Sequence, residues 1–74
     1  MTNVEEIILN VLATVTKQDV SNITMDTPLA EVGLKSIQLI SVSALLDEKL
    51  DDAPNFRALM NMEKVSDIRD FIEG

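Results

Sequence analysis

"EVGLKSIQLISVSALL", residues 31–46, is the stretch that decides the fold expected for this chain. A glycine, a lysine and a serine stand directly before a run that is apolar at nearly every second or third position. From Ser36 to about Leu50, one set of side chains falls on a single arc at about 100° per residue, as on one face of a helix. That arc consists of Leu39, Val42, Ser43, Leu46 and Leu50. The pattern predicts a helix that begins at Ser36 and packs this face on the core.

Helical periodicity recurs in three other parts of the chain. Apolar residues are spaced three and four apart over residues 3–16, over about residues 55–61 after Pro54, and from Val65 onward. Residues 17–35 lose this period and collect residues typical of turns and caps, which predicts a long connecting loop. Its apolar residues are expected to hold it to the core, namely Val20, Ile23, Leu29, Val32 and Leu34. With no lasting alternation at period two, the sequence predicts an all-α four-helix bundle with a short third helix and a long loop between helices one and two.

Length, charge and composition narrow the class of protein. The 74 residues allow a single domain, residues 1–74. Six basic against thirteen acidic residues give a net charge of −7, which repels nucleic acid and anionic lipid and favours partners with basic surfaces. No apolar run approaches the roughly 18 residues of a membrane span, and the acidic start is unlike a signal peptide. The absence of cysteine suits a reducing compartment. We therefore expect a monomeric cytoplasmic protein that binds no nucleic acid and spans no membrane.

The residue inventory argues against an enzyme. A nucleophilic serine needs a general base, and the chain has no histidine to take the proton. Gly33 and Gly74 are the only glycines, so there is no glycine-rich phosphate loop. An acidic cluster lacks the ligand spacing and central glycine of a calcium loop and is better explained as a solvated surface; it comprises Asp47, Glu48, Asp51 and Asp52. We expect no catalytic residue and no metal site.

Ser36 allows two interpretations from its position alone. As a helix N-cap, it would accept a backbone N–H bond and stabilise the helix by about 1 kcal/mol. As a phosphate anchor, it would use the unpaired N–H groups and partial positive charge of the helix start. Gly33 permits a tight turn before it, which would leave the hydroxyl at an exposed corner that another enzyme could reach. The neighbouring Lys35 could pair with a phosphodiester there or simply be solvated.

Two stretches resemble the acyl carrier protein family: "DTPLAEVGLKSIQLISVSALLDEKL", residues 26–50, and "KVSDIRDFIE", residues 64–73. The likeness extends over the whole chain, although Lys35 replaces the family's usual aspartate, and Gln38 and Ser41 replace acidic residues of the second helix. It implies that a phosphopantetheinyl transferase attaches a 4′-phosphopantetheine arm from coenzyme A to Ser36. Acyl intermediates of fatty acid, polyketide or related biosynthesis would then be held as thioesters on the arm and passed between acyl-transferring or condensing enzymes.

Two alternatives stay open at this point. The chain could be an aminoacyl or peptidyl carrier of a nonribosomal-type pathway, with the same arm and a different cargo. From another class of protein, it could be a carrier-like helical interaction module in which Ser36 is an unmodified cap.

Two surfaces are expected around the arm. An acyl chain would be sheltered from water in a pocket between helix two and the short third helix. This pocket is expected to be lined by Leu39, Val42, Leu46, Phe56, Leu59, Met60 and Met62. Opposite the core arc, helix two carries an apolar stripe of Ile37, Ile40 and Ala44, which is expected to face solvent and contact partner enzymes. Farther along, Asp47, Glu48 and Asp51 are expected to steer a basic partner.

Overall fold

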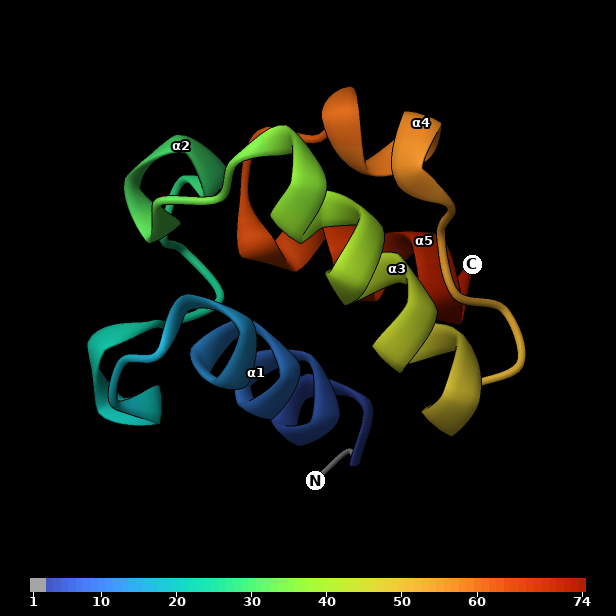
Figure 1. Cartoon of the computed structure of the whole chain (residues 1–74). Helices are drawn as coiled ribbons and strands as arrows, with labels where there is room; N and C mark the ends of the chain where they lie inside the picture. The colour runs from blue at the N-terminus through green and yellow to red at the C-terminus, as the bar shows by residue number, and fades with distance from the viewer. Residues whose placement is uncertain (1–2) are drawn as a thin grey trace.

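The computed structural model describes residues 3–74 and is built from helices (Figure 1). In chain order these are α1 (Asn3–Thr16), the 3-10 helix η1 (Val20–Asn22), α2 (Leu29–Val32), α3 (Ser36–Lys49), α4 (Phe56–Met60) and α5 (Val65–Glu73). Residues 3–74 contain no strand. The all-α prediction is therefore confirmed, and α1, α3, α4 and α5 lie where the four helices were expected.

The core forms where these four helices meet. Its most deeply buried side chains come from each of them: Ile8 and Leu12 from α1, Val42 and Leu46 from α3, Leu59 from α4, and Val65 and Ile68 from α5. α3 packs against α1 and α4, and α1 packs against α5. At the edge of the contact between α1 and α5, Arg69 Nη1 donates to Glu5 Oε2 at 2.9 Å. The predicted apolar arc of α3 is thus turned inward, with Leu39, Ser43 and Leu50 partly buried around Val42 and Leu46.

α1 ends in a left-handed turn at Lys17, whose φ is 57°. The Gln18 N–H donates to the Ala13 carbonyl at 3.1 Å, and the Lys17 N–H donates to the Thr14 carbonyl at 3.4 Å. These two bonds make a Schellman motif, which satisfies carbonyl groups that the end of a helix leaves free. Glycine is the usual residue at this position because a side chain strains left-handed backbone. Lys17 therefore carries a small strain.

The connection between α1 and α3 is more ordered than the sequence predicted, because it contains η1 and α2. Ile23, Leu29 and Val32 are buried in the core, as expected, and Leu34 packs against it. The expectation for Val20 is wrong, since this side chain is 41% exposed at the start of η1. Helices of three and four residues are too short to produce a periodic pattern, which explains why the sequence showed only a loop.

Backbone hydrogen bonds tie the second half of this connection to the segment before α5. The Leu29 N–H donates to the Glu63 carbonyl at 2.7 Å, and the Val65 N–H donates to the Thr27 carbonyl at 3.0 Å. α2 is thereby fixed beside the chain that joins α4 to α5. In Figure 1, α2 also lies next to the first turn of α3, to which it is joined by only three residues.

Polar side chains cap the last two helices. At the start of α4, Asn55 Oδ1 accepts from the Ala58 N–H at 2.8 Å. At the start of α5, Asp67 Oδ2 accepts from the Glu63 N–H at 2.9 Å and from the Lys64 N–H at 3.1 Å. These two bonds hold the pKa of the Asp67 carboxyl below its ordinary value, because they favour the charged form.

Candidate functional site

Ser36 is the first residue of α3, and the N-cap position before it belongs to Lys35, whose backbone is extended at φ −93° and ψ 168°. The interpretation of Ser36 as the cap is therefore wrong. A lysine side chain cannot accept a hydrogen bond, so the capping contact comes from inside the helix instead. Gln38 Oε1 accepts from the Lys35 N–H at 2.8 Å, which is one half of a capping box.

This arrangement leaves the Ser36 hydroxyl available. Ser36 is exposed, and its hydroxyl makes no hydrogen bond with any other residue of the range 3–74. The first backbone bonds of α3 run from the N–H groups of Gln38 and Leu39 to the Lys35 carbonyl, so within the same range the N–H groups of Ser36 and Ile37 have no partner. Free N–H groups at the start of a helix favour a phosphate. The residues present thus fit a phosphodiester on Ser36.

Gly33 turns the chain between α2 and α3. It ends α2 in the left-handed region, at φ 89° and ψ 27°. Nothing lies within 4 Å of the place where a Cβ would stand, so backbone conformation rather than space accounts for the glycine. The turn expected from the sequence is present. Two residues farther on, the Lys35 side chain is exposed and makes no ion pair within residues 3–74.

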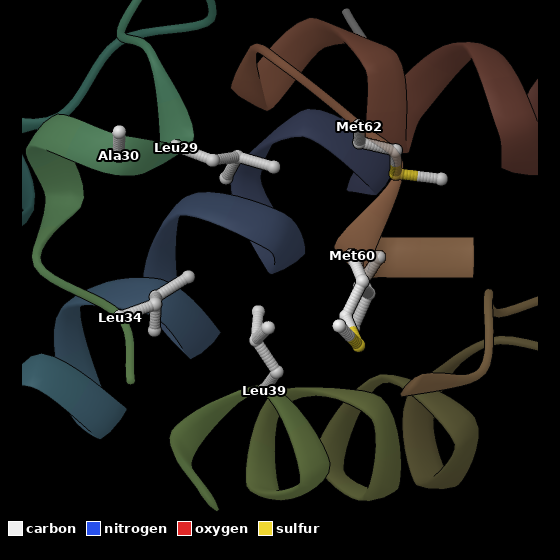
Figure 2. Close-up of a pocket in the computed structure, with 7 residues that line it drawn as sticks. Leu29, Ala30, Leu34, Leu39, Met60 and Met62 are labelled. Carbon is white, nitrogen blue, oxygen red and sulfur yellow. The ribbon is translucent and has the colours of Figure 1, made fainter. Parts of the chain in front are cut away.

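An apolar hollow of about 270 Å³ lies between α2, α3 and α4 (Figure 2). Its lining consists of Leu29, Ala30, Leu34, Leu39, Leu59, Met60 and Met62. Figure 2 shows Leu29, Leu34 and Leu39 pointing into this space, which Met60 and Met62 border from the other side. Leu34 and Leu39 flank Ser36 in the chain, so the hollow lies next to the segment that carries the serine.

The hollow differs in part from the pocket that the sequence suggested. Four of the seven predicted side chains border it: Leu39, Leu59, Met60 and Met62. Val42 and Leu46 do not, because they are fully buried in the core. Phe56 borders a second hollow instead. The sequence reasoning missed Leu29, Ala30 and Leu34, since α2 was not foreseen; the apolar character of Leu29 and Leu34 was the available signal.

The second hollow, of about 390 Å³, lies between α3 and the chain that leads into α4. It is bordered by Ile40, Ser43, Ala44, Asp47, Ala53, Asn55 and Phe56. The predicted apolar stripe of α3 faces solvent: Ile37 is 72% exposed, Ile40 is 53% exposed, and Ala44 is exposed as well. The helix therefore presents uncovered apolar side chains in the turns that directly follow Ser36.

The acidic residues lie at the other end of α3. Asp47 and Glu48 are exposed in its last turn, and Asp51 is exposed in the turn that follows, because the helix ends at Lys49. About three helical turns separate Asp47 from Ser36. The serine end of the helix thus carries the positive charge of Lys35, while the acidic side chains of the far end stand together with Lys49 and leave that end net negative.

A metal centre and a membrane-spanning helix are two further features that a structure can reveal. Residues 3–74 contain no group of three or more histidine, cysteine, aspartate or glutamate side chains that could hold a metal ion. Over the same residues, no helix combines the length and apolar character that crossing a membrane requires.

Fold and site together define a class of small helical proteins that present an exposed serine at a helix start, beside an apolar hollow. The family model described as phosphopantetheine attachment site matches residues 6–72. The chain belongs to this family, whose domains are non-catalytic carriers with covalently attached 4′-phosphopantetheine. Such carriers interact with phosphopantetheinyl transferases and biosynthetic enzymes. The resemblance found in the sequence is thereby confirmed, while no curated protein and no solved structure matches the chain significantly.

Proposed function

We propose that this chain is an acyl carrier protein whose arm is attached to Ser36. The observation that supports this most directly is the exposed Ser36 hydroxyl, which makes no hydrogen bond within residues 3–74 at the first position of α3. In the attachment, the Ser36 oxygen bonds to the pantetheine-side phosphorus of coenzyme A, the P–O bond to the adenosine-bearing phosphate breaks, and the transferase takes the hydroxyl proton. The bound arm supplies the thiol that holds the cargo as a thioester.

The other serines of α3 are in different surroundings. Ser43 is partly buried and donates to the Pro54 carbonyl at 3.0 Å. Ser41 is exposed, but it lies beyond the first turn of α3, where the backbone N–H groups are used by the helix itself. Of the three serines of α3, only Ser36 is both exposed and located at the start of the helix, where backbone N–H groups are free. Ser41 is therefore the matched control for modification at Ser36.

The hollow beside Ser36 favours an acyl cargo over an aminoacyl cargo. None of its lining side chains carries a hydrogen-bonding nitrogen or oxygen. An alkyl chain that enters it gains about 0.8 kcal/mol per buried CH₂. A charged amino group would lose its hydration there without finding a partner. Met60 and Met62 are flexible enough to repack around chains of different shape.

We further propose that partner enzymes dock on the exposed side of α3. Near the arm, Ile37, Ile40 and Ala44 would supply apolar contact, and their exposure supports this role. At the far end, Asp47, Glu48 and Asp51 would attract basic partners without being buried. The protein would have no catalytic activity of its own and would act in the cytoplasm, with coenzyme A as the donor of its arm.

Incubation with coenzyme A and a promiscuous phosphopantetheinyl transferase, followed by intact-mass measurement, tests the proposal. Wild type and Ser41→Ala should each gain one phosphopantetheine, and Ser36→Ala should gain none while keeping its helical circular dichroism spectrum. Modification of Ser36→Ala would refute the assigned residue. An unmodified wild-type chain would favour the alternative of a carrier-like interaction module without an arm. Loading of the modified protein by amino acids rather than acyl groups would favour an aminoacyl or peptidyl carrier.

A further inference from the structure

We propose that Gln18 and Gln38 position Ser36 for attachment of the arm by holding the segment Gly33–Lys35 at both of its ends. The inference rests on the proposed function, because it takes Ser36 as the residue that is modified. Gln18 and Gln38 are the two glutamines of the chain, and both side chains are partly buried. Each joins the last turn of α1 to one end of this segment.

Gln18 holds the end that leaves α2. Its amide nitrogen Nε2 donates to the Val32 carbonyl at 3.1 Å and to Thr16 Oγ1 at 2.7 Å. The Thr16 hydroxyl in turn donates to the Leu12 carbonyl at 2.7 Å, inside α1. Both N–H groups of the Gln18 amide are therefore used, and they connect the last carbonyl of α2 to the rigid end of α1.

Gln38 holds the end that enters α3. Its Oε1 accepts from the Lys35 N–H at 2.8 Å, and its Nε2 donates to the Val15 carbonyl at 3.5 Å. The first of these bonds is short and fixes the residue that directly precedes Ser36. The second is long and therefore weaker, and it joins α3 to the last turn of α1.

Besides these two anchors, the segment is held by the Lys35 carbonyl, which accepts from the N–H groups of Gln38 and Leu39. Gly33 has a left-handed backbone and no atom within 4 Å of its missing Cβ, so it has wide freedom once the anchors are lost. Lys35 is exposed, and only the partly buried Leu34 packs against the core. The two amide side chains therefore add the bonds that fix the Val32 carbonyl before this segment and the Lys35 N–H at its end.

Attachment needs the Ser36 oxygen in line with the P–O bond that breaks, so freedom in this segment lowers the rate of the chemical step. Docking of the transferase on Ile40 would be changed much less, since this exposed side chain lies one turn farther along α3 than Ser36. The two glutamines are positioning residues, and their loss should reduce kcat more than it raises KM.

The test measures steady-state modification of apo protein by a purified phosphopantetheinyl transferase, with hydrogen exchange of the Lys35 amide as a second readout. Gln18→Met and Gln38→Met keep the length of each side chain and remove its hydrogen bonds. Each should lower kcat about fivefold, as the loss of roughly one net hydrogen bond implies, with KM changed less than twofold. Exchange at the Lys35 amide, which donates to Gln38 Oε1, should become faster in both variants.

Two glutamate variants separate positioning from general stability. Gln38→Glu keeps the oxygen that accepts from the Lys35 N–H, so its kcat should stay within twofold of wild type. Gln18→Glu loses both donated bonds and should behave like Gln18→Met. Thr27→Val removes the bond that Thr27 Oγ1 accepts from the Thr24 N–H at 2.9 Å, in the middle of the same connection and before α2, and should leave kcat unchanged.

The outcomes distinguish this inference from the proposed function. A wild-type chain that is not modified overturns both. A modified wild type, with kcat unaltered in the two methionine variants and exchange at the Lys35 amide unaltered, overturns the positioning role alone. If a methionine variant does not fold, the glutamate pair decides: an equal loss of kcat in Gln18→Glu, Gln38→Glu and Thr27→Val would show that stability, and not positioning, is responsible.

Discussion

Replacing Ile40 by aspartate should weaken docking of a partner enzyme more than removing a charge at Glu48. Ile40 is 53% exposed, so a partner that covers it buries about half of an isoleucine side chain. Full burial of such a side chain is worth about 2 kcal/mol, which makes the lost contact about 1 kcal/mol, or about fivefold in affinity. The carboxylate of Ile40→Asp must also be desolvated, so a tenfold loss is the expected result. Glu48→Gln removes one exposed charge, worth about 0–1 kcal/mol.

The assay is the KM for the carrier in modification by the transferase, measured at low and at high salt. Phe71→Asp is the matched control, because Phe71 is 50% exposed on α5 and lies on another helix. It should leave KM unchanged, which would show that the effect of Ile40→Asp is local. Raising the salt should weaken docking only modestly, since screening acts mainly on exposed charges. If Glu48→Gln were the more damaging change, charge and not apolar contact would determine docking, and the reasoning would be refuted.

Three further predictions follow from individual contacts. Lys17→Gly should raise the free energy of unfolding by about 0.5 kcal/mol in a urea titration, because the relief of left-handed strain exceeds the entropy that glycine adds to the unfolded chain. Lys17→Gln removes only the charge and should leave the free energy of unfolding unchanged. Because the pKa of Asp67 is lowered in the folded state, this carboxylate stabilises the fold above about pH 4 and loses that effect as the pH falls below this value. The difference in the free energy of unfolding between wild type and Asp67→Asn should therefore become smaller in acid. Attachment of a medium-length acyl group should shift the methyl resonances of Leu39 and Met60, and shifts confined to the surface near Ser36 would mean that the cargo stays in solvent.

The long helices could be predicted from the sequence because each has enough turns to show a period. α1 begins and ends where the apolar spacing placed it, and Val42 and Leu46 are buried on the predicted face of α3. The solvent-facing positions of Ile37 and Ile40 follow from the same wheel, since they lie opposite that face. These positions depend only on local geometry, which the order of residues determines.

The hollow beside Ser36 could be predicted only in part, because it depends on contacts between distant segments. Leu29 reaches it through a backbone bond from its N–H to the Glu63 carbonyl, a pairing that no local pattern reveals. The helix α2 was not predicted either, because its four residues are too few to show a period in the sequence. Helix wheels therefore identify which faces are apolar, but they do not show which segments close a cavity.

One of the two interpretations of Ser36 placed the N-cap of α3 one residue too late, and the difference bears on function. Serine before an apolar run is a common cap, and the rule would have used the Ser36 hydroxyl to satisfy the helix. A hydroxyl that accepts a capping bond is held against its own helix and is less free to act as a nucleophile. Gln38 caps Lys35 instead, which moves the capping function to a side chain inside the helix and leaves Ser36 exposed. Because the N-cap position lies one residue before Ser36, neither Lys35 nor the aspartate that is usual in the family would engage the Ser36 hydroxyl, and the serine stays exposed with either residue.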